Sequence, residues 1–402
     1  MGRSAISAVT PGRVGAVFVA LAILWRILEV NAVLYDPNGR PRLPSFPATG
    51  IAAAPQARAM LVSVLRDNPA QAEALLLLAR DFESESRPAD AARSYEAAYR
   101  LAPLDREVLV AASSFFLRDG KVDEALVLMD RLVEHYPETR ERVFPVFTEL
   151  LVGSRHASAW SRIVAREPSW LGAFLVSSCR KGVEPSLLMP MFMARLAASK
   201  AQPVETACLV DHLRAAERWE EAYQVWLNTL PRARLADVGS IFNGSFEDAP
   251  SGLGFDWIPA RGAEREVGHT VEVLRSTGGA GKYALKVTYN GKRQFGVAIA
   301  QYLLLAPGRY EISGLAHPDS MRVGRGVQWT VRCVSEGAPG ALIANSERFT
   351  GSSEWRRFAF DVVVEASCRG QILQLEPASP GESATYLAGA AWFDDLSARR
   401  AP

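Results

Sequence analysis

Residues 72–103 of this chain read AEALLLLARDFESESRPADAARSYEAAYRLAP, and residues 106–137 read REVLVAASSFFLRDGKVDEALVLMDRLVEHYP. Each stretch ends in a proline, and Pro69, Pro103 and Pro137 are spaced 34 residues apart. When the repeats are aligned on these prolines, small and large apolar residues fall at matching positions. A small residue lets two helices approach closely, and a proline ends the second helix because it has no backbone N–H to donate. The repeat therefore predicts successive pairs of packed helices.

This pattern resembles the tetratricopeptide repeat. The signature positions are Ala91, Tyr95, Ala98, Pro103, Gly120, Ala125 and Pro137. The match weakens after Pro137, and Pro185 and Pro190 are expected to interrupt the later helices, so residues 52–235 are predicted to form one α-solenoid with irregular later repeats. The resemblance implies a concave face that binds a protein partner; the alternative is that the array is only a spacer.

The charged residues of the first repeats have a simpler interpretation. They are expected to form a solvated face and not a ligand clamp. The set comprises Arg80, Asp81, Arg87, Arg93 and Arg100.

From Ile241 onward, short runs of β-branched and aromatic residues alternate with turns rich in Gly, Ser and Asn. This spacing over residues 240–400 predicts an all-β sandwich or jelly roll. The expected strands are Tyr283–Tyr289, Phe295–Leu305, Gly308–Ala316, Gln328–Val334, Glu354–Val364 and Gln371–Pro377.

Three motifs follow one another in this region: NGSFE at 243–247, GGAGKYALKV at 278–287 and AWFDDL at 391–396. Together they resemble the galactose-binding-like jelly roll of carbohydrate-binding modules. That resemblance implies a structural calcium ion, since oxygen ligands suit calcium. Its ligands would be the carboxylates of Glu247 and of Asp394 or Asp395, with carbonyls near Gly281 and Lys282. The middle motif lacks the usual acidic residue, and the alternative is that these carboxylates cap strand ends.

Sugar recognition requires aromatic planes for the apolar faces of pyranose rings and polar groups for their hydroxyls. The candidates are Trp257, Trp329, Trp355, Tyr302, Gln301 and Arg293. Each lies in or beside an apolar strand, so the alternative for any one of them is a role in the core.

The four cysteines fall into two neighbourhoods, Cys179 with Cys208 and Cys333 with Cys368. Cys333 lies in one expected strand and Cys368 just before another, so strand packing could bring them together. In an oxidising compartment we expect these two to form a disulfide.

The N-terminus indicates the compartment. Residues 14–35 form an apolar stretch long enough to span a bilayer, and Arg3 and Arg13 precede it. Positive charge before the span favours a cytoplasmic segment at 1–13 and a periplasmic body, in a single-pass inner-membrane protein. The Pro-rich residues 36–51 are expected to be a stiff linker. The alternatives are a cleaved signal peptide and an ordinary buried helix.

Composition and motifs exclude several classes of function. Lys and Arg total 45 against 44 Asp and Glu, without the basic excess of a nucleic-acid binder. None of the common nucleophile, zinc or phosphate-loop motifs occurs, so we expect no catalytic residue and no cofactor besides calcium.

The combination of anchor, helical repeats and carbohydrate-module-like domain resembles accessory proteins of bacterial polysaccharide synthesis and export. It implies a non-catalytic scaffold whose helices dock a protein partner and whose β domain contacts a glycan or a protein. The alternatives are a polysaccharide-modifying hydrolase or lyase acting through the β domain, and an assembly scaffold that has lost sugar binding.

Overall fold

A computed structural model describes residues 55–153, 156–260, 268–294, 296–322, 325–335, 338–378 and 385–401. The predicted cytoplasmic segment, membrane anchor and linker lie outside these residues. Within the described part of the chain, no helix is both long enough and apolar enough to cross a membrane. The chain divides into two compact units, residues 1–139 and residues 140–402.

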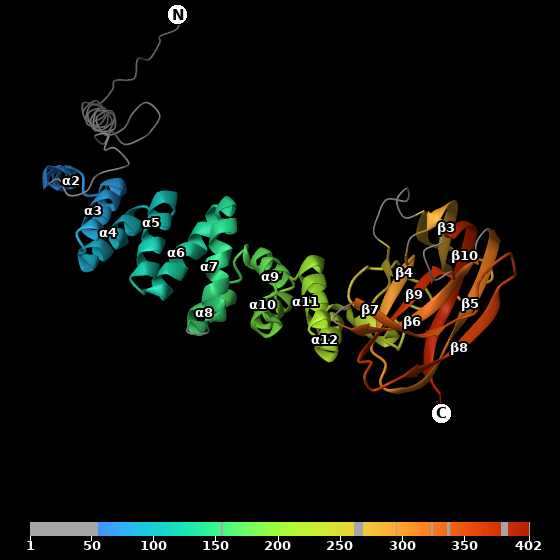
Figure 1. The fold of residues 1–402 in the computed structure, drawn as a ribbon. Coiled ribbons are helices and arrows are strands. Elements are labelled where there is room, and N and C mark those ends of the chain that lie inside the picture. Colours follow the sequence, from blue (N-terminus) through green and yellow to red (C-terminus); the bar gives the residue numbers. More distant parts are fainter. Residues whose placement is uncertain are drawn as a thin grey trace, which may run out of the picture. The chain divides into compact units, whose positions relative to one another are not determined.

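The first unit consists of the helices that the repeat predicts (Figure 1). They are α2 (Pro55–Asp67), α3 (Ala72–Ser84), α4 (Pro88–Leu101), α5 (Arg106–Arg118), α6 (Val122–His135) and the short η1 (Pro137–Thr139). Ala91, Ala98 and Ala125 have no exposed surface, so the paired helices approach closely. Gly120 has a φ of +76° in the turn between α5 and α6, which glycine adopts without strain. The helical pairs and their turns are as predicted.

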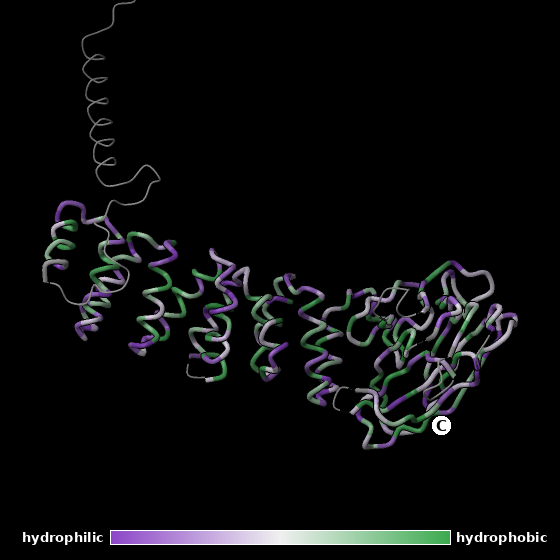
Figure 2. The backbone as a smooth tube through the Cα atoms, turned by 45° about the horizontal axis from the view of Figure 1, so that its top comes forward, coloured by the Kyte–Doolittle hydropathy of each residue, from purple (hydrophilic) through white to green (hydrophobic). Residues whose placement is uncertain are grey.

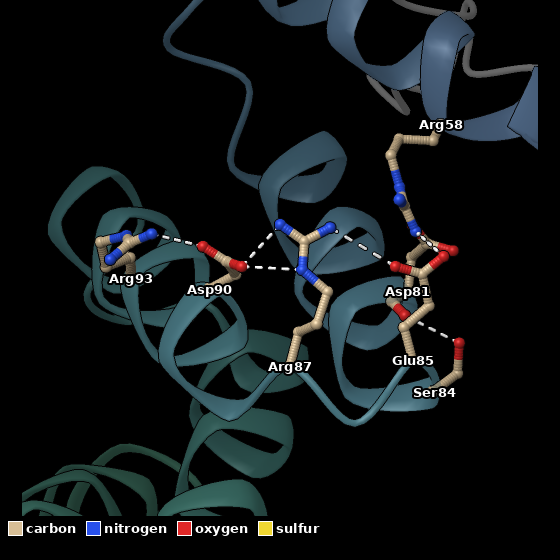
Figure 3. Close-up of polar contacts among 7 residues, drawn as sticks. All are labelled: Arg58, Asp81, Ser84, Glu85, Arg87, Asp90 and Arg93. Atoms are coloured by element: carbon tan, nitrogen blue, oxygen red, sulfur yellow. Dashed lines mark hydrogen bonds and ion pairs between the residues drawn. The ribbon is translucent and has the colours of Figure 1, made fainter.

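Ion pairs join the first three helices of this unit (Figure 3). Arg58 pairs with Asp81 at 2.5 Å and with Glu85 at 2.6 Å. Arg87 pairs with Asp90 at 2.6 Å and with Glu85 at 3.4 Å. Asp81 is only 5% exposed, so the expectation of a solvated face is wrong for this residue. These acids and arginines neutralise one another and hold α2 against α3.

The second unit begins with further helices and continues into the β-sandwich. The helices are α7 (Arg140–Val152), α8 (Ala157–Arg166), α9 (Leu171–Arg180), α10 (Pro185–Ala197), α11 (Pro203–Ala215), α12 (Trp219–Thr229) and the short η2 (Arg232–Asp237). Pro185 starts α10 at a position where the missing N–H costs nothing. Pro190 lies inside α10 without ending it, so the expected interruption there is wrong. A disulfide between Cys179 and Cys208 joins α9 to α11.

Two five-stranded antiparallel sheets form the sandwich. The first sheet has the order β1-β4-β9-β6-β7, and the second has the order β2-β3-β10-β5-β8. The strands are β1 (Ile258–Pro259), β2 (His269–Arg275), β3 (Tyr283–Gln294), β4 (Ile299–Leu303), β5 (Gly308–Arg322), β6 (Val327–Ser335), β7 (Ala338–Asn345), β8 (Arg356–Val364), β9 (Gly370–Pro377) and β10 (Thr385–Arg400). The predicted sandwich is confirmed, and β1, β2, β7 and β10 lie outside the predicted strands.

Apolar and polar residues alternate along the strands, and the apolar ones pack between the two sheets. On β6, Val327, Trp329 and Val331 are fully buried between the sheets, whereas Gln328 and Arg332 point to the outer face. Figure 2 shows this mixture of apolar and polar residues along the strands. The predicted Cys333–Cys368 disulfide is confirmed, with its Cα atoms 5.5 Å apart.

Candidate functional site

Two of the predicted sugar platforms are core residues. Trp257 and Trp329 have no exposed surface, and their ring centres lie 5.6 Å apart. The indole N–H of Trp257 donates to the carbonyl of Asn243 at 3.0 Å. A sugar cannot reach either ring, so the prediction that they contact a glycan is wrong. Both occupy positions that face inward, where large aromatic side chains fill the core.

Gln301 is also an inward-facing residue. Its side-chain amide donates to the carbonyl of Phe242 at 2.7 Å and accepts from the Phe242 N–H at 3.1 Å. It has no exposed surface and ties residue 242 to β4, so its predicted contact with sugar is wrong. Tyr302, the next residue, points to the outer face of the first sheet. The side chain of Arg293 lies outside the described part of the chain.

Trp355 lies on the other side of the sandwich. It precedes β8 directly and is half-buried, with its ring centre 5.6 Å from that of His317 on β5. Trp392 on β10 is paired with His317, and the Lys286 ammonium lies 4.8 Å from the Trp392 ring centre. These residues form a row on the outer face of the second sheet. The structure therefore separates Trp355 from Tyr302.

The predicted calcium ligands meet at the loop between β2 and β3. One Glu247 oxygen accepts from the N–H groups of Lys282 at 2.7 Å and of Tyr283 at 3.2 Å. One Asp394 oxygen accepts from the N–H groups of residues 280 and 281, and the other accepts from the N–H of residue 395. Both oxygens of Asp394 and one oxygen of Glu247 thus accept from N–H donors of the chain itself.

This donor set fits a pair of structural caps better than a cation site, because calcium takes six to eight oxygen ligands. Asp395 is turned away, 3.7 Å from Arg357. Within the described residues, no group of three or more His, Cys, Asp or Glu side chains is placed to hold a metal ion. Burial raises the pKa of Asp394, while its three N–H partners act in the opposite direction.

Replacing Asp394 with asparagine is expected to lower the free energy of unfolding by about 1–3 kcal/mol, because buried N–H donors lose their acceptor. The matched control is Asp395→Asn, which removes an exposed charge and is expected to change stability by less than about 0.5 kcal/mol. Thermal unfolding in EDTA and in calcium measures both variants. An equal loss of stability of Asp394→Asn in EDTA and in calcium supports a role of this carboxylate as a structural cap. A loss of stability seen only in calcium supports the predicted calcium site.

An aromatic junction holds the last helices against the sandwich. The Trp226 ring centre lies 5.0 Å from that of Phe242 and 5.7 Å from that of Phe255. Trp219 is 1% exposed and lies 6.1 Å from the Tyr302 ring centre. A β-carbon on Gly370 would come within 2.2 Å of the Trp219 ring, so only glycine fits there. This packing makes α12 part of the sandwich surface.

Beside this junction, the outer face of the first sheet carries a polar row. Gln374 on β9 is paired with Thr330 on β6, and both side chains are at least 95% buried. Among the described residues, the Thr330 hydroxyl has no hydrogen-bond partner, and Gln374 lines the cavity described next. Arg332 and Glu376 form an ion pair with an N–O distance of 3.1 Å. These two residues lie in the pairs of β6 and β9 residues on either side of the Thr330–Gln374 pair. Buried polar groups normally have partners, so the unpaired hydroxyl of Thr330 is unusual.

A cavity of about 330 Å³ opens over Gln374, and we name it the α11 cavity. Its floor is the first sheet, with Ala300, Tyr302 and Gln374. Its walls are α11, the loop that leads into β1, and β1 with the residue that follows it. The wall residues are Ala207, Asp211, Arg214, Gly252, Gly254, Ile258, Pro259 and Ala260, and Val297 completes the lining.

Arg214 is the charged group of the α11 cavity. It is 6% exposed, donates to the Gly254 carbonyl at 3.0 Å and also donates to the Asp211 carboxylate. Its guanidinium carbon lies 3.6 Å from the Tyr302 ring centre, an arrangement in which cation and ring attract each other. Burial lowers the pKa of Arg214, but a guanidinium stays charged at neutral pH. Asp211 balances this charge, so the cavity is polar and neutral.

Of the predicted sugar-contacting residues whose side chains the structure describes, only Tyr302 lines the α11 cavity. Gln374 could have been found from sequence, since a polar residue between Leu373 and Leu375 marks an outward position on a strand. Arg214 and Asp211 could not, because nothing in the helical sequence indicates that α11 meets the sandwich.

No protein-family model matches the sequence, and no curated protein is significantly similar to it. Solved structures resembling the β-sandwich include a CBM4 domain, with 19% identity, a TM-score of 0.29, and coverage of 40% of this chain and 100% of that one. Another is the CBM22-1 xylan-binding domain of Paenibacillus barcinonensis Xyn10C, with 19% identity, a TM-score of 0.29, and coverage of 39% and 91%. A third is TmCBM61 in complex with β-1,4-galactotriose, with 17% identity, a TM-score of 0.27, and coverage of 41% and 99%. At these identities and TM-scores, function is argued from the residues of this chain.

Proposed function

We propose that this protein binds a neutral glycan in the α11 cavity and acts without catalysis. The observation that carries the proposal is the polar lining of the α11 cavity, where the Gln374 amide lies on the floor and Arg214 and Asp211 lie in the wall. An amide offers both a donor and an acceptor, which suits the hydroxyl groups of a sugar. A sugar hydroxyl in the cavity would exchange hydrogen bonds directly with this amide.

The remaining groups of the cavity support a sugar. Arg214 is a rigid donor of several N–H groups, Asp211 is an acceptor, and Tyr302 and Pro259 add apolar surface. Such a mixture matches a pyranose ring, which has apolar faces and a polar rim. The balance of one arginine and one aspartate favours an uncharged sugar over an acidic one.

A binding role is favoured over hydrolysis by the acids of the cavity. Glycosidases of the common mechanisms use two carboxyl groups that flank the scissile bond. Among the described lining residues Asp211 is the single carboxylate, and it is paired with Arg214.

The wider role proposed here is that of a scaffold in envelope or exopolysaccharide assembly. The apolar stretch at 14–35 would anchor the chain in the bacterial inner membrane, with its body in the periplasm. The two disulfides support an oxidising compartment. The helical pairs, proposed to be tetratricopeptide repeats, would bind a protein partner on their concave face.

The glycan proposal is tested by Gln374→Leu in the full chain. Binding of cellotriose, xylohexaose, β-1,4-galactotriose and maltotriose is measured by calorimetry, after a glycan array has ranked other neutral glycans. The variant is expected to weaken binding about tenfold, since leucine fills the same space without hydrogen bonds. Gln328→Leu is the control, because it makes the same change on the same sheet face outside the cavity. Equal affinities of the two variants, or no binding of any glycan by the wild type, would overturn the proposal.

A further inference from the structure

The α11 cavity is bounded by helix α11 and by the segment from Gly252 to Ala260. Helix α11 contributes Ala207, Asp211 and Arg214 to one wall. The segment from Gly252 to Ala260, which includes β1, forms the adjoining wall, and Arg214 donates to its Gly254 carbonyl at 3.0 Å. A polymer lying across the strands would therefore run into helix and loop.

The side chain of Trp219 covers the same sheet face beyond Tyr302. Trp219 of α12 is seated on Gly370 at the start of β9 and beside Tyr302 on β4. Trp219 is 1% exposed, so it is held in the aromatic junction and is not a side chain that swings aside. The sheet face beyond Tyr302 is covered by protein.

The size of the cavity agrees with a short ligand. Its volume of about 330 Å³ lies at the lower end of the roughly 300–1,000 Å³ common for small-molecule sites. That space accommodates a terminal sugar unit and its neighbour, and not the interior of a polymer chain.

We infer that the α11 cavity recognises the end of an uncharged glycan chain. This inference rests on the proposed glycan binding and adds the part of the polymer that is bound. Helix α11 forms the wall that prevents a polymer from passing through the site. The helices therefore determine which part of a glycan chain the β-sandwich can bind. A chain-end binder would respond to the number of polymer ends and not to polymer mass.

The test compares oligosaccharides of one series that differ in length and in their ends. Calorimetry with the full chain uses the trisaccharide and the hexasaccharide of the best-binding series from the array. The two affinities are expected to agree within about threefold, because units beyond the cavity make no contact. Chain ends are then modified in separate samples, by borohydride reduction of the reducing end and by a benzylidene acetal on the non-reducing end.

One of the two modifications is expected to abolish binding. The end at which modification abolishes binding is the end of the glycan that enters the cavity. Binding that survives both modifications, or that strengthens more than about tenfold from trisaccharide to hexasaccharide, would overturn end recognition while leaving glycan binding intact. Absence of binding by every unmodified oligosaccharide would instead remove the proposed function itself.

Discussion

Replacing Glu205 with glutamine is expected to lower the free energy of unfolding of the second unit by about 3 kcal/mol. Glu205 and Arg195 form a two-point ion pair, with N–O distances of 2.7 and 2.8 Å and side chains only 3% and 8% exposed. Glutamine keeps the shape but removes the charge, which leaves a buried guanidinium without a counter-ion. Urea unfolding followed by circular dichroism measures the loss.

The matched control for this variant is Glu167→Gln. Glu167 pairs with Lys200 at 2.7 Å, but the lysine is 53% exposed. Exposed ion pairs contribute about 0–1 kcal/mol, so this variant should remain close to the wild type. Equal effects of the two substitutions would show that the Arg195–Glu205 pair is not buried in the folded protein.

Replacing Trp219 with alanine is expected to cost about 3–5 kcal/mol, the usual range for removing a fully buried aromatic side chain. The change empties the space between Gly370 and Tyr302 and removes the contact with Phe255, whose ring centre is 6.4 Å away. We expect calorimetric unfolding to separate into two transitions, because the helices lose their hold on the sandwich.

The control for the junction is Trp392→Ala on the opposite sheet. Trp392 is half-buried on the outer face. Its replacement is expected to lower the free energy of unfolding by about 1 kcal/mol and to leave a single unfolding transition. If Trp219→Ala unfolded in one transition at the wild-type temperature, the helices and the sandwich would not be coupled through this side chain.

Much of the fold could be predicted because its signals are local. The prolines at 69, 103 and 137 and the small residues between them specify helical pairs without any distant contact. Most strands rich in β-branched residues are predicted for the same reason, although β2, with the sequence HTVEVLR, is not. Strand β7 was missed because its sequence, APGALIAN, contains mostly small residues that are poor in strand signals.

The site could be predicted only in part, since it depends on which face of a strand a residue occupies and on what covers it. Trp257 and Trp329 look like sugar platforms in the sequence, but alternation along β6 turns Trp329 inward, and Trp257 packs against it with the ring centres 5.6 Å apart. Tyr302 and Gln301 are neighbours with opposite roles for the same reason. Arg214 lies far from Gln374 in the chain, and only the aromatic junction brings them to one cavity.

The measurement that tests the central claim most directly is hydrogen–deuterium exchange of the full chain with and without the best-binding neutral oligosaccharide. The account predicts slower exchange in peptides that contain residues 207–214, 252–260 and 372–376, which surround the α11 cavity. Unchanged exchange there, with protection confined to the row of Trp355, His317 and Trp392 or to the helices of residues 72–135, would contradict it.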